Sequence, residues 1–277
     1  MKTVQRILVA LDDSPQSRAA LYEAAKLAAR LHADLDGVFV LDTELLRLGE
    51  LPIACETEMI SSTRRTIDTR TMERALQRQA QRLQASLAQT ARQHQVRSTF
   101  RLSRGNVATE VLAAAAGADL LALGRQGQTA IMSRRPGSTL RRILAEADCS
   151  LLFPNRGNGV GDSVVVLFDG TDATRASLSY ARHVAGHRDM GLAVLLCGAA
   201  ENVEALRGEA LEALSTAPGE PPPAITFHAV APGNLRALPQ LVSGLGAGLL
   251  VLPRTSALAD DRDDLLRNVG CPVLLTA

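Results

Sequence analysis

One stretch of this 277-residue chain contains residues that could bind an anion through their backbone groups. It runs from Leu120 to Thr139 and reads LLALGRQGQTAIMSRRPGST, a short apolar segment followed by glycines and then by a helical pattern. The residues with a candidate role are Gly124, Arg125, Gly127, Gly137, Ser138 and Thr139. Glycines between a strand and a helix let main-chain N–H groups close around an anion, and the helix N-terminus adds partial positive charge. The pattern predicts a phosphate-binding loop.

This loop differs from the Walker phosphate loop because it has no GxxxxGK[ST] pattern and no lysine. Its cations are all arginines: Arg125, Arg134 and Arg135. The spacing Gly-x2-Gly-x9-Gly-Ser, from Gly124 to Ser138, resembles the nucleotide-binding signature of the universal stress protein family. A helical pattern and a closing strand, Asp148–Pro154, follow in the order found in that family.

The resemblance implies that the chain binds ATP, accompanied by Mg²⁺ held mainly by phosphate oxygens and water. It implies these contacts: Asp12 and Val40 beside the adenine; Gly124, Arg125 and Gly127 around the ribose and first phosphates; Gly137, Ser138 and Thr139 around the distal phosphates. Gly127 and Gly137 are expected to bring the backbone close to phosphate or to use positive φ. Leu140 stands where many family members carry a second hydroxyl, and Thr139 is the nearest substitute.

The elements that must position this loop follow an alternating strand and helix pattern. Arg6–Leu11 is an apolar run of strand length, and Ser14-Pro15 then offers an N-cap and a first helical residue. The helical pattern continues to about Leu31 and is followed by a second strand, Leu35–Leu41. Such β-α-β units build a doubly wound parallel sheet, in which ligands bind beyond the strand carboxyl ends where the strand order reverses.

Further elements complete the first half of the chain. We expect a long amphipathic helix from Met72 to Ala91 and then strand Val96–Leu102, helix Val107–Ala116, strand Leu120–Leu123, helix Thr139–Glu146 and strand Ser150–Phe153. The segment Asp42–Thr71 lacks a regular pattern and is interpreted as a lid or surface excursion. If the strand order reverses between the first and fourth strands, Asp12 and Gly124 meet at the site.

The second half repeats the first. A Gly/Asn-rich linker, Asn155–Asp162, precedes an apolar strand, Ser163–Phe168. The echoes include Gly117–Arg125 with Gly246–Arg254, Gly105-Asn106 with Gly233-Asn234, and Cys149 with Cys271. We therefore predict an α/β protein with two tandem doubly wound five-stranded parallel-sheet (Rossmann-like) domains, residues 1–154 and 162–277.

The two halves are not expected to be equal in function. Pro253 stands where the first half has Gly124, and proline has no N–H to offer. The segment Pro253–Gly270 lacks the glycine pattern and contains four aspartates (Asp260, Asp261, Asp263 and Asp264) that would repel a polyphosphate. The sequence predicts one nucleotide site per chain, in the first half.

Composition excludes several other classes of protein. With 30 lysines and arginines against 29 aspartates and glutamates, no strong overall field attracts nucleic acid or an anionic membrane. The run after Lys2 and Arg6 stops at Asp12, and Leu241–Pro253 is too short to span a bilayer. We expect a soluble, cytoplasmic protein with no nucleic-acid or membrane partner.

No metal ligands and no catalytic residues are assigned. Four cysteines are scattered without a CxxC motif, which indicates reduced, mostly buried thiols. His183 and His187 have the spacing of a metal pair, but no glutamate follows His183, and a helix C-terminus favours histidine anyway. No Ser/His/Asp or Cys/His set can be assembled.

The leading functional hypothesis is a cytoplasmic stress-response protein that binds ATP in its first half and acts as a regulatory binding module for a protein partner. The alternatives are a slow ATP-hydrolysing enzyme of the same superfamily and a ligand-free interaction scaffold. Against hydrolysis, nothing in the loop resembles a positioned general base or a phosphate-gripping lysine.

Assembly is predicted from the closing strands. Each half ends in a short apolar strand, Leu151–Phe153 and Val273–Leu275, which as a fifth strand would lie at a sheet edge. The resemblance implies that this edge mediates pairing, and the tandem chain holds two such edges at high effective concentration. We expect an intrachain pseudo-dimer, with a homodimer of chains as a further form.

Overall fold

The computed structural model describes residues 4–48, 55–57, 64–66, 69–124, 137–155, 161–186, 190–215, 224–231, 237–254, 265–266 and 268–277. The first half contains β1 (Arg6–Ala10), α1 (Pro15–Leu31), β2 (Asp34–Asp42), α2 (Thr43–Leu48), β3 (Cys55–Thr57), β4 (Arg64–Thr66), α3 (Thr69–Gln93), β5 (Ser98–Gly105), α4 (Val107–Ala115), β6 (Leu120–Ala122), α5 (Ser138–Glu146) and β7 (Ser150–Phe153). The second half contains β8 (Ser163–Phe168), α6 (Asp172–Gly186), β9 (Gly191–Cys197), a 3₁₀ turn (Ala200–Asn202), α7 (Val203–Ser215), β10 (Ile225–Val230), α8 (Leu238–Gly244), β11 (Ala247–Pro253) and β12 (Val273–Thr276).

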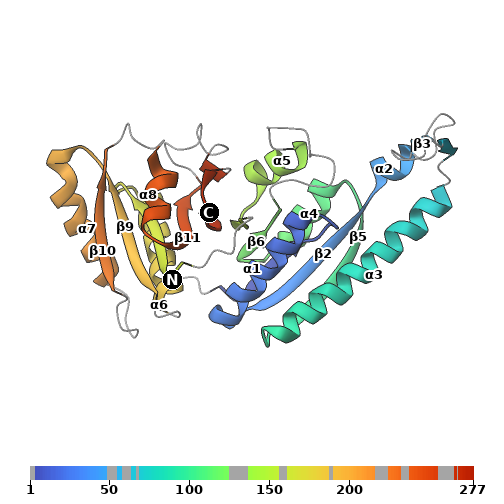
Figure 1. Cartoon of the computed structure of the whole chain (residues 1–277), viewed down its shortest axis with the longest axis horizontal. Helices are drawn as coiled ribbons and strands as arrows, with labels where there is room; N and C mark the ends of the chain where they lie inside the picture. The colour runs from blue at the N-terminus through green and yellow to red at the C-terminus, as the bar shows by residue number, and fades with distance from the viewer. Residues whose placement is uncertain are drawn as a thin grey trace.

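Ten strands form one continuous sheet, in the order β10-β9-β8-β11-β12-β7-β6-β1-β2-β5. Within each half the five strands are parallel, and both halves have the doubly wound order in which the first strand lies between the second and the fourth. Figure 1 shows the two halves side by side along the long axis, with α7 and β10 at one end and β5 and α3 at the other. The α/β fold class predicted from the sequence is confirmed.

The first β-α unit shows why these residues adopt this fold. Ile7, Leu8 and Val9 in β1 are all at most 2% exposed, as a central parallel strand requires. The side chain of Ser14 caps α1 by accepting the N–H of Ser17 at 3.0 Å, and Pro15 follows as the first helical residue. The helix ends at Leu31, and the C-cap residue, His32, has a left-handed conformation with φ 53°.

Helices cover both faces of the sheet. One buried cluster lies under α1, α3, α6 and α7, and the other lies under α4, α5 and α8. Both clusters contain residues of both halves, because alternate residues of β7 and β12 face opposite sides. The chain therefore has one continuous core on each face of the sheet. No helix among the described residues is long and apolar enough to cross a membrane.

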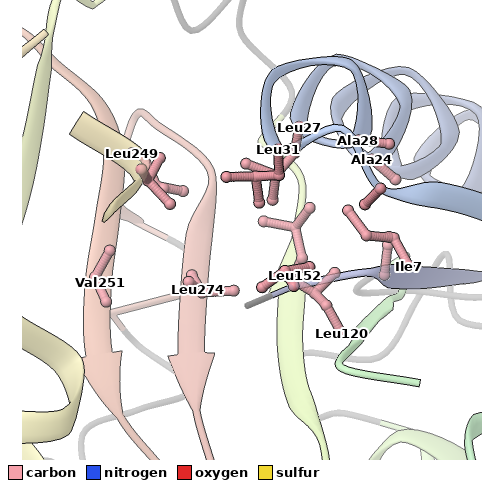
Figure 2. Close-up of a cluster of buried hydrophobic side chains, with 14 of the residues drawn as sticks. Ile7, Ala24, Leu27, Ala28, Leu31, Leu120, Leu152, Leu249, Val251 and Leu274 are labelled. Carbon is pink, nitrogen blue, oxygen red and sulfur yellow. The ribbon is translucent and has the colours of Figure 1, made fainter. Parts of the chain in front are cut away.

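The halves join through β7 and β12, which pair antiparallel. Phe153 lies opposite Val273, Leu152 opposite Leu274, and Leu151 opposite Leu275. Figure 2 shows Leu27 and Leu31 of α1 above this junction, with Leu152 and Leu274 beneath them. Two strands that would be exposed edges in isolated halves thus lie in the middle of the ten-stranded sheet.

The segment between the second strand and the long helix is more regular than the sequence indicates. Helix α2 begins directly after β2, and the carboxylate of Asp42 accepts the N–H of Glu44 at 2.9 Å. Strands β3 and β4 pair antiparallel, with Cys55 opposite Thr66. Three-residue strands and a six-residue helix are too short to produce a readable hydrophobic period, so the expectation of an irregular segment was wrong for these residues.

Candidate functional site

The predicted site lies where the strand order of the first half reverses. Strand β1 pairs with β2 on one side and β6 on the other, with Leu8 opposite both Asp36 and Leu121. Because these strands are parallel, their carboxyl ends meet at one edge of the sheet. Asp12 follows β1 and Gly124 follows β6, while Val40 lies in β2 two residues beyond Val38, the last residue paired with β1, so the fold brings all three to this edge.

Asp12 is fixed by the turn that leads into α1. Its backbone N–H donates to Oγ of Ser17 at 2.9 Å, and its Oδ1 accepts the N–H of Ser14 at 2.9 Å. Ser14 and Ser17 are both at most 3% exposed. The turn thus holds the Asp12 carboxylate at the end of β1, and its Oδ2 accepts no hydrogen bond from the described residues.

Val40 places backbone groups at the same edge. The carbonyl of Val38 accepts the N–H of Leu11 at 2.8 Å, one residue beyond the end of β1. Since peptide groups two residues apart in a strand point the same way, those of Val40 face the space beyond the end of β1. The Val40 side chain is buried toward α4, in the cluster with Val38 and Val111.

Gly124 is needed for packing as well as for any ligand contact. A Cβ at Gly124 would lie 3.1 Å from Cβ of Gln16 and 3.2 Å from both the carbonyl carbon of Gln16 and the backbone nitrogen of Ser17. The chain just after β6 therefore lies so close to the first turn of α1 that a side chain here would require the neighbouring atoms to shift by a few tenths of an ångström. Arg125 and Gly127, the next two predicted site residues, lie outside the described residues.

Gly137, Ser138 and Thr139 form the start of α5. Gly137 is the N-cap, has φ −61° and ψ 161°, and makes no side-chain cap hydrogen bond with the described residues. It does not adopt positive φ, so of the two uses expected for this glycine only close backbone approach remains. A Cβ here would meet no described atom within 4 Å. The first-turn N–H groups of an α-helix have no intrahelical acceptor, and in α5 no side chain of the described residues caps them, so they are suited to binding an anion.

A hydrogen-bond network that the sequence analysis missed orients α5. Arg142, one turn into the helix, donates from Nη1 to Oγ1 of Thr109 at 2.9 Å and to Oδ1 of Asn106 at 3.4 Å. Asn106 directly follows β5 and caps α4 by accepting the N–H of Thr109. This places the N-terminal part of α5 at the carboxyl edge of the sheet. The repeated Gly-Asn pair, at Gly105 and again in the second half, was the signal that could have indicated this cap.

Comparisons with known proteins agree with this geometry. The model of the universal stress protein family matches residues 3–153. The chain belongs to the universal stress protein family. No curated protein is a significant match to it.

Solved structures extend the likeness to both halves. A universal stress protein from Archaeoglobus fulgidus matches with a TM-score of 0.74 at 15% identity, over 99% of this chain and 99% of that chain. A functionally unknown protein from Pseudomonas aeruginosa matches with a TM-score of 0.58 at 15% identity, over 99% of this chain and 92% of that chain. At these identities the matches show a shared fold, which includes the tandem arrangement.

The second universal stress protein half repeats the turn of Asp12 in detail. The N–H of Asp169 donates to Oγ1 of Thr174 at 3.4 Å, and Oδ1 of Asp169 accepts the N–H of Thr171 at 3.0 Å. Burial opposes ionisation of Asp169, but hydrogen bonds from Thr171 and Thr174 outweigh it and lower the pKa of the carboxyl group. Ser17 and Thr174 each lie five residues after the aspartate of their turn, so the two supporting hydroxyls also occupy equivalent positions.

The other edge positions differ between the halves. The strand registers align Ile7 and Leu120 with Val164 and Leu249, which puts Pro253 at the place of Gly124. The same alignment puts Cys197 at the place of Val40. Burial, together with the negative charge of Asp169, raises the pKa of the Cys197 thiol. The second half thus keeps the supporting turn and lacks the glycine that lets the fourth strand approach the helix.

Proposed function

We propose that this chain binds one ATP molecule at the carboxyl edge of its first half and acts as a regulatory nucleotide-binding module. The observation that carries the proposal is the combination, at one edge, of the fixed Asp12 carboxylate, the strand ends around β1 and the start of α5, which no side chain of the described residues caps. Carboxylate and peptide groups can pair with adenine, while free helix N–H groups suit phosphate.

The contacts follow the order of these groups. The Oδ2 atom of Asp12, which accepts no hydrogen bond from the described part of the chain, and the backbone of Val40 would pair with the adenine edge. Gly124 and Gly127 would lie against the ribose and the first phosphates, and Arg125 would be the adjacent cation. Gly137, Ser138 and Thr139 would hold the distal phosphates through N–H groups and two hydroxyls. Mg²⁺ would be coordinated by the phosphate oxygens and by water molecules, because this ion gives up its bound water reluctantly.

Binding without efficient hydrolysis is supported by the state of the nearby carboxylates. Asp13 pairs with Arg18 and with Arg82, each at 3.3 Å, and Asp42 accepts the N–H of Glu44. A general base must be within reach of the attacking water and free to accept its proton. Asp13 and Asp42 are thus engaged, and the remaining oxygen of Asp12 is assigned to the adenine and not to the phosphates, which favours a binding role over the slow hydrolase.

The second half serves as a built-in structural partner. Because β12 covers β7, a homodimer of chains would have to use another surface, such as the outer strands β5 and β10. Pro253 removes both a backbone donor and the close approach that Gly124 permits, so we propose no nucleotide site in that half.

Isothermal titration calorimetry with ATP and Mg²⁺ tests this function. The wild-type chain should bind one equivalent. Gly137→Val should abolish binding with an unchanged circular dichroism melt, because a side chain there clashes with no described atom and blocks only the ligand. Gly270→Val is the matched control: a Cβ at this exposed glycine of the second half also meets no atom within 4 Å. Two equivalents, none, or normal binding by Gly137→Val would contradict the proposal.

A further inference from the structure

Arg254 reaches from the second half to the end of helix α5 in the first. Its Nη1 donates a hydrogen bond to the carbonyl oxygen of Ala147, the C-cap residue of α5. Its own N–H donates to the carbonyl of Thr276 at 2.9 Å, which anchors Arg254 to β12. A cation at a helix C-terminus is attracted by the partial negative charge there. Arg254 therefore ties the last turn of α5 to the neighbouring half.

The positive charge of Arg254 also affects the pKa of the Cys149 thiol. Cys149 lies two residues after Ala147 and is buried. Burial raises the pKa of this thiol, and the positive charge of Arg254 is among the effects that partly oppose the increase. The positive charge of Arg254 is therefore felt at Cys149 as well as at Ala147, the residue that its guanidinium contacts.

Helix α5 depends on contacts from outside for its orientation. It has only nine residues and no basic residue in its last turn, where Glu146 instead adds a negative charge. Toward α4 it is held by the buried Ile143 and by Arg142. Its C-terminal end is held by Arg254. A rotation of so short a helix moves both ends, so a contact at the C-cap also fixes the direction of the first turn.

Arg254 occupies a position in the second half that is equivalent to a predicted nucleotide-site residue of the first half. The registers of β6 and β11 place Arg254 at the repeat position of Arg125, beside the first glycine of the nucleotide-binding pattern. The second half has lost that pattern, yet its arginine is engaged with the helix that begins with Gly137. We propose that Arg254 is a positioning residue through which the second half sets the orientation of α5 and hence the nucleotide affinity of the first half.

This coupling is reciprocal by thermodynamic linkage. If the Arg254 contact favours the orientation of α5 that binds nucleotide, nucleotide must strengthen the Arg254 contact by the same factor. The affinity part of the inference rests on the proposed ATP binding. The orientation of α5 can be measured without any nucleotide.

Hydrogen exchange and calorimetry on the full chain test the two parts separately. Arg254→Met keeps the aliphatic stem and removes the guanidinium, so it tests the hydrogen bond and charge without opening a cavity. In nucleotide-free protein the α5 amides, including that of Ala147, should exchange about tenfold faster, as expected on losing one charge-assisted hydrogen bond. The amides of β7 should be unchanged. The dissociation constant for ATP should rise severalfold.

Three variants complete the design. Arg207→Met is the control, because Arg207 is an exposed arginine of the second half that pairs only with Glu204, at 3.9 Å, among the ion pairs described. Arg254→Lys should restore part of the α5 protection. Arg254→Gln, which lacks the charge, repeats the test should Arg254→Met not fold. Wild-type exchange of α5 in a folded Met or Gln variant would overturn the proposal. If the wild-type chain binds no ATP, the proposed function fails and the exchange measurement still decides the role of Arg254.

Discussion

Shortening one leucine at the junction of the halves should destabilise both halves together. Leu274 in β12 is fully buried and lies opposite Leu152 in β7, below Leu27 and Leu31 of α1. Leu274→Ala should lower the free energy of unfolding by about 3 kcal/mol through lost burial and the cavity left behind. With a urea slope of about 3 kcal/mol/M, the unfolding midpoint should fall by about 1 M.

The chain contains its own probes for this experiment. It has no tryptophan and two tyrosines, Tyr22 in α1 of the first half and Tyr180 in α6 of the second. In the single-tyrosine backgrounds Tyr22→Phe and Tyr180→Phe, tyrosine fluorescence reports one half at a time. Both transitions should coincide and shift together on Leu274→Ala, because the core is continuous across the junction.

The control is a leucine whose removal leaves the junction intact. Leu211 in α7 is 42% exposed, so Leu211→Ala should change the free energy of unfolding by only about 0.5 kcal/mol. The reasoning fails if Leu274→Ala shifts the Tyr180 transition while the Tyr22 transition stays at its wild-type midpoint. Two separable halves would then each have a complete core.

Three further perturbations test individual contacts. Gly124→Ala should cost about 1–3 kcal/mol of stability in a thermal or urea melt, because its Cβ would press on the backbone of α1; an unchanged melt would show that the two segments separate freely. Ser17→Ala should cost about 1 kcal/mol, because the partly buried N–H of Asp12 loses its acceptor, and equal stability would contradict this role of Ser17. Burial of Tyr180, aided by the charge of Asp119, raises the pKa of its phenol. Below pH 10 the phenol is protonated in both the folded and the unfolded chain, but above pH 10 only the unfolded chain loses the proton, so wild-type stability should fall relative to Tyr180→Phe by about 1.4 kcal/mol per pH unit. Parallel pH profiles of the two proteins would contradict this reasoning.

The elements that the sequence predicted well are those whose signals are local and redundant. Helix α1 begins at Pro15 and ends at Leu31 as expected, because a cap, a proline and an apolar face all agree. The buried strands β7 and β8 match their predicted bounds for a similar reason, since each is a short apolar run between polar residues. Helix α2 and the β3-β4 pair were missed because elements this short carry too few residues to show a period.

The sequence predicted where the candidate site lies in the fold, but not the hydrogen bonds that hold its residues in place. Asp12 and Gly124 follow the neighbouring strands β1 and β6, which is the arrangement expected if the strand order reverses between the first and fourth strands. The hydroxyl of Ser17 and the bond from Arg142 to Thr109 could not be inferred, because serines and arginines are common on helices and only coordinates show which of them face a neighbour. The conformation of Gly137 illustrates the same limit, since a glycine in a sequence does not reveal its φ.

The contact of Arg254 with Ala147 depends on how the halves are placed, and this explains how the second half could diverge and remain useful. Pairing of β7 with β12 requires only apolar strands of matching length, which both halves keep. Each half therefore needs the other for its core whether or not it binds a ligand. Pro253 occupies the repeat position of Gly124, and the next residue, Arg254, contacts the C-cap of α5 in the other half. In this proposal, the carboxyl edge of the second half contributes Arg254 to the support of α5, and so supports the nucleotide-binding edge of the first half.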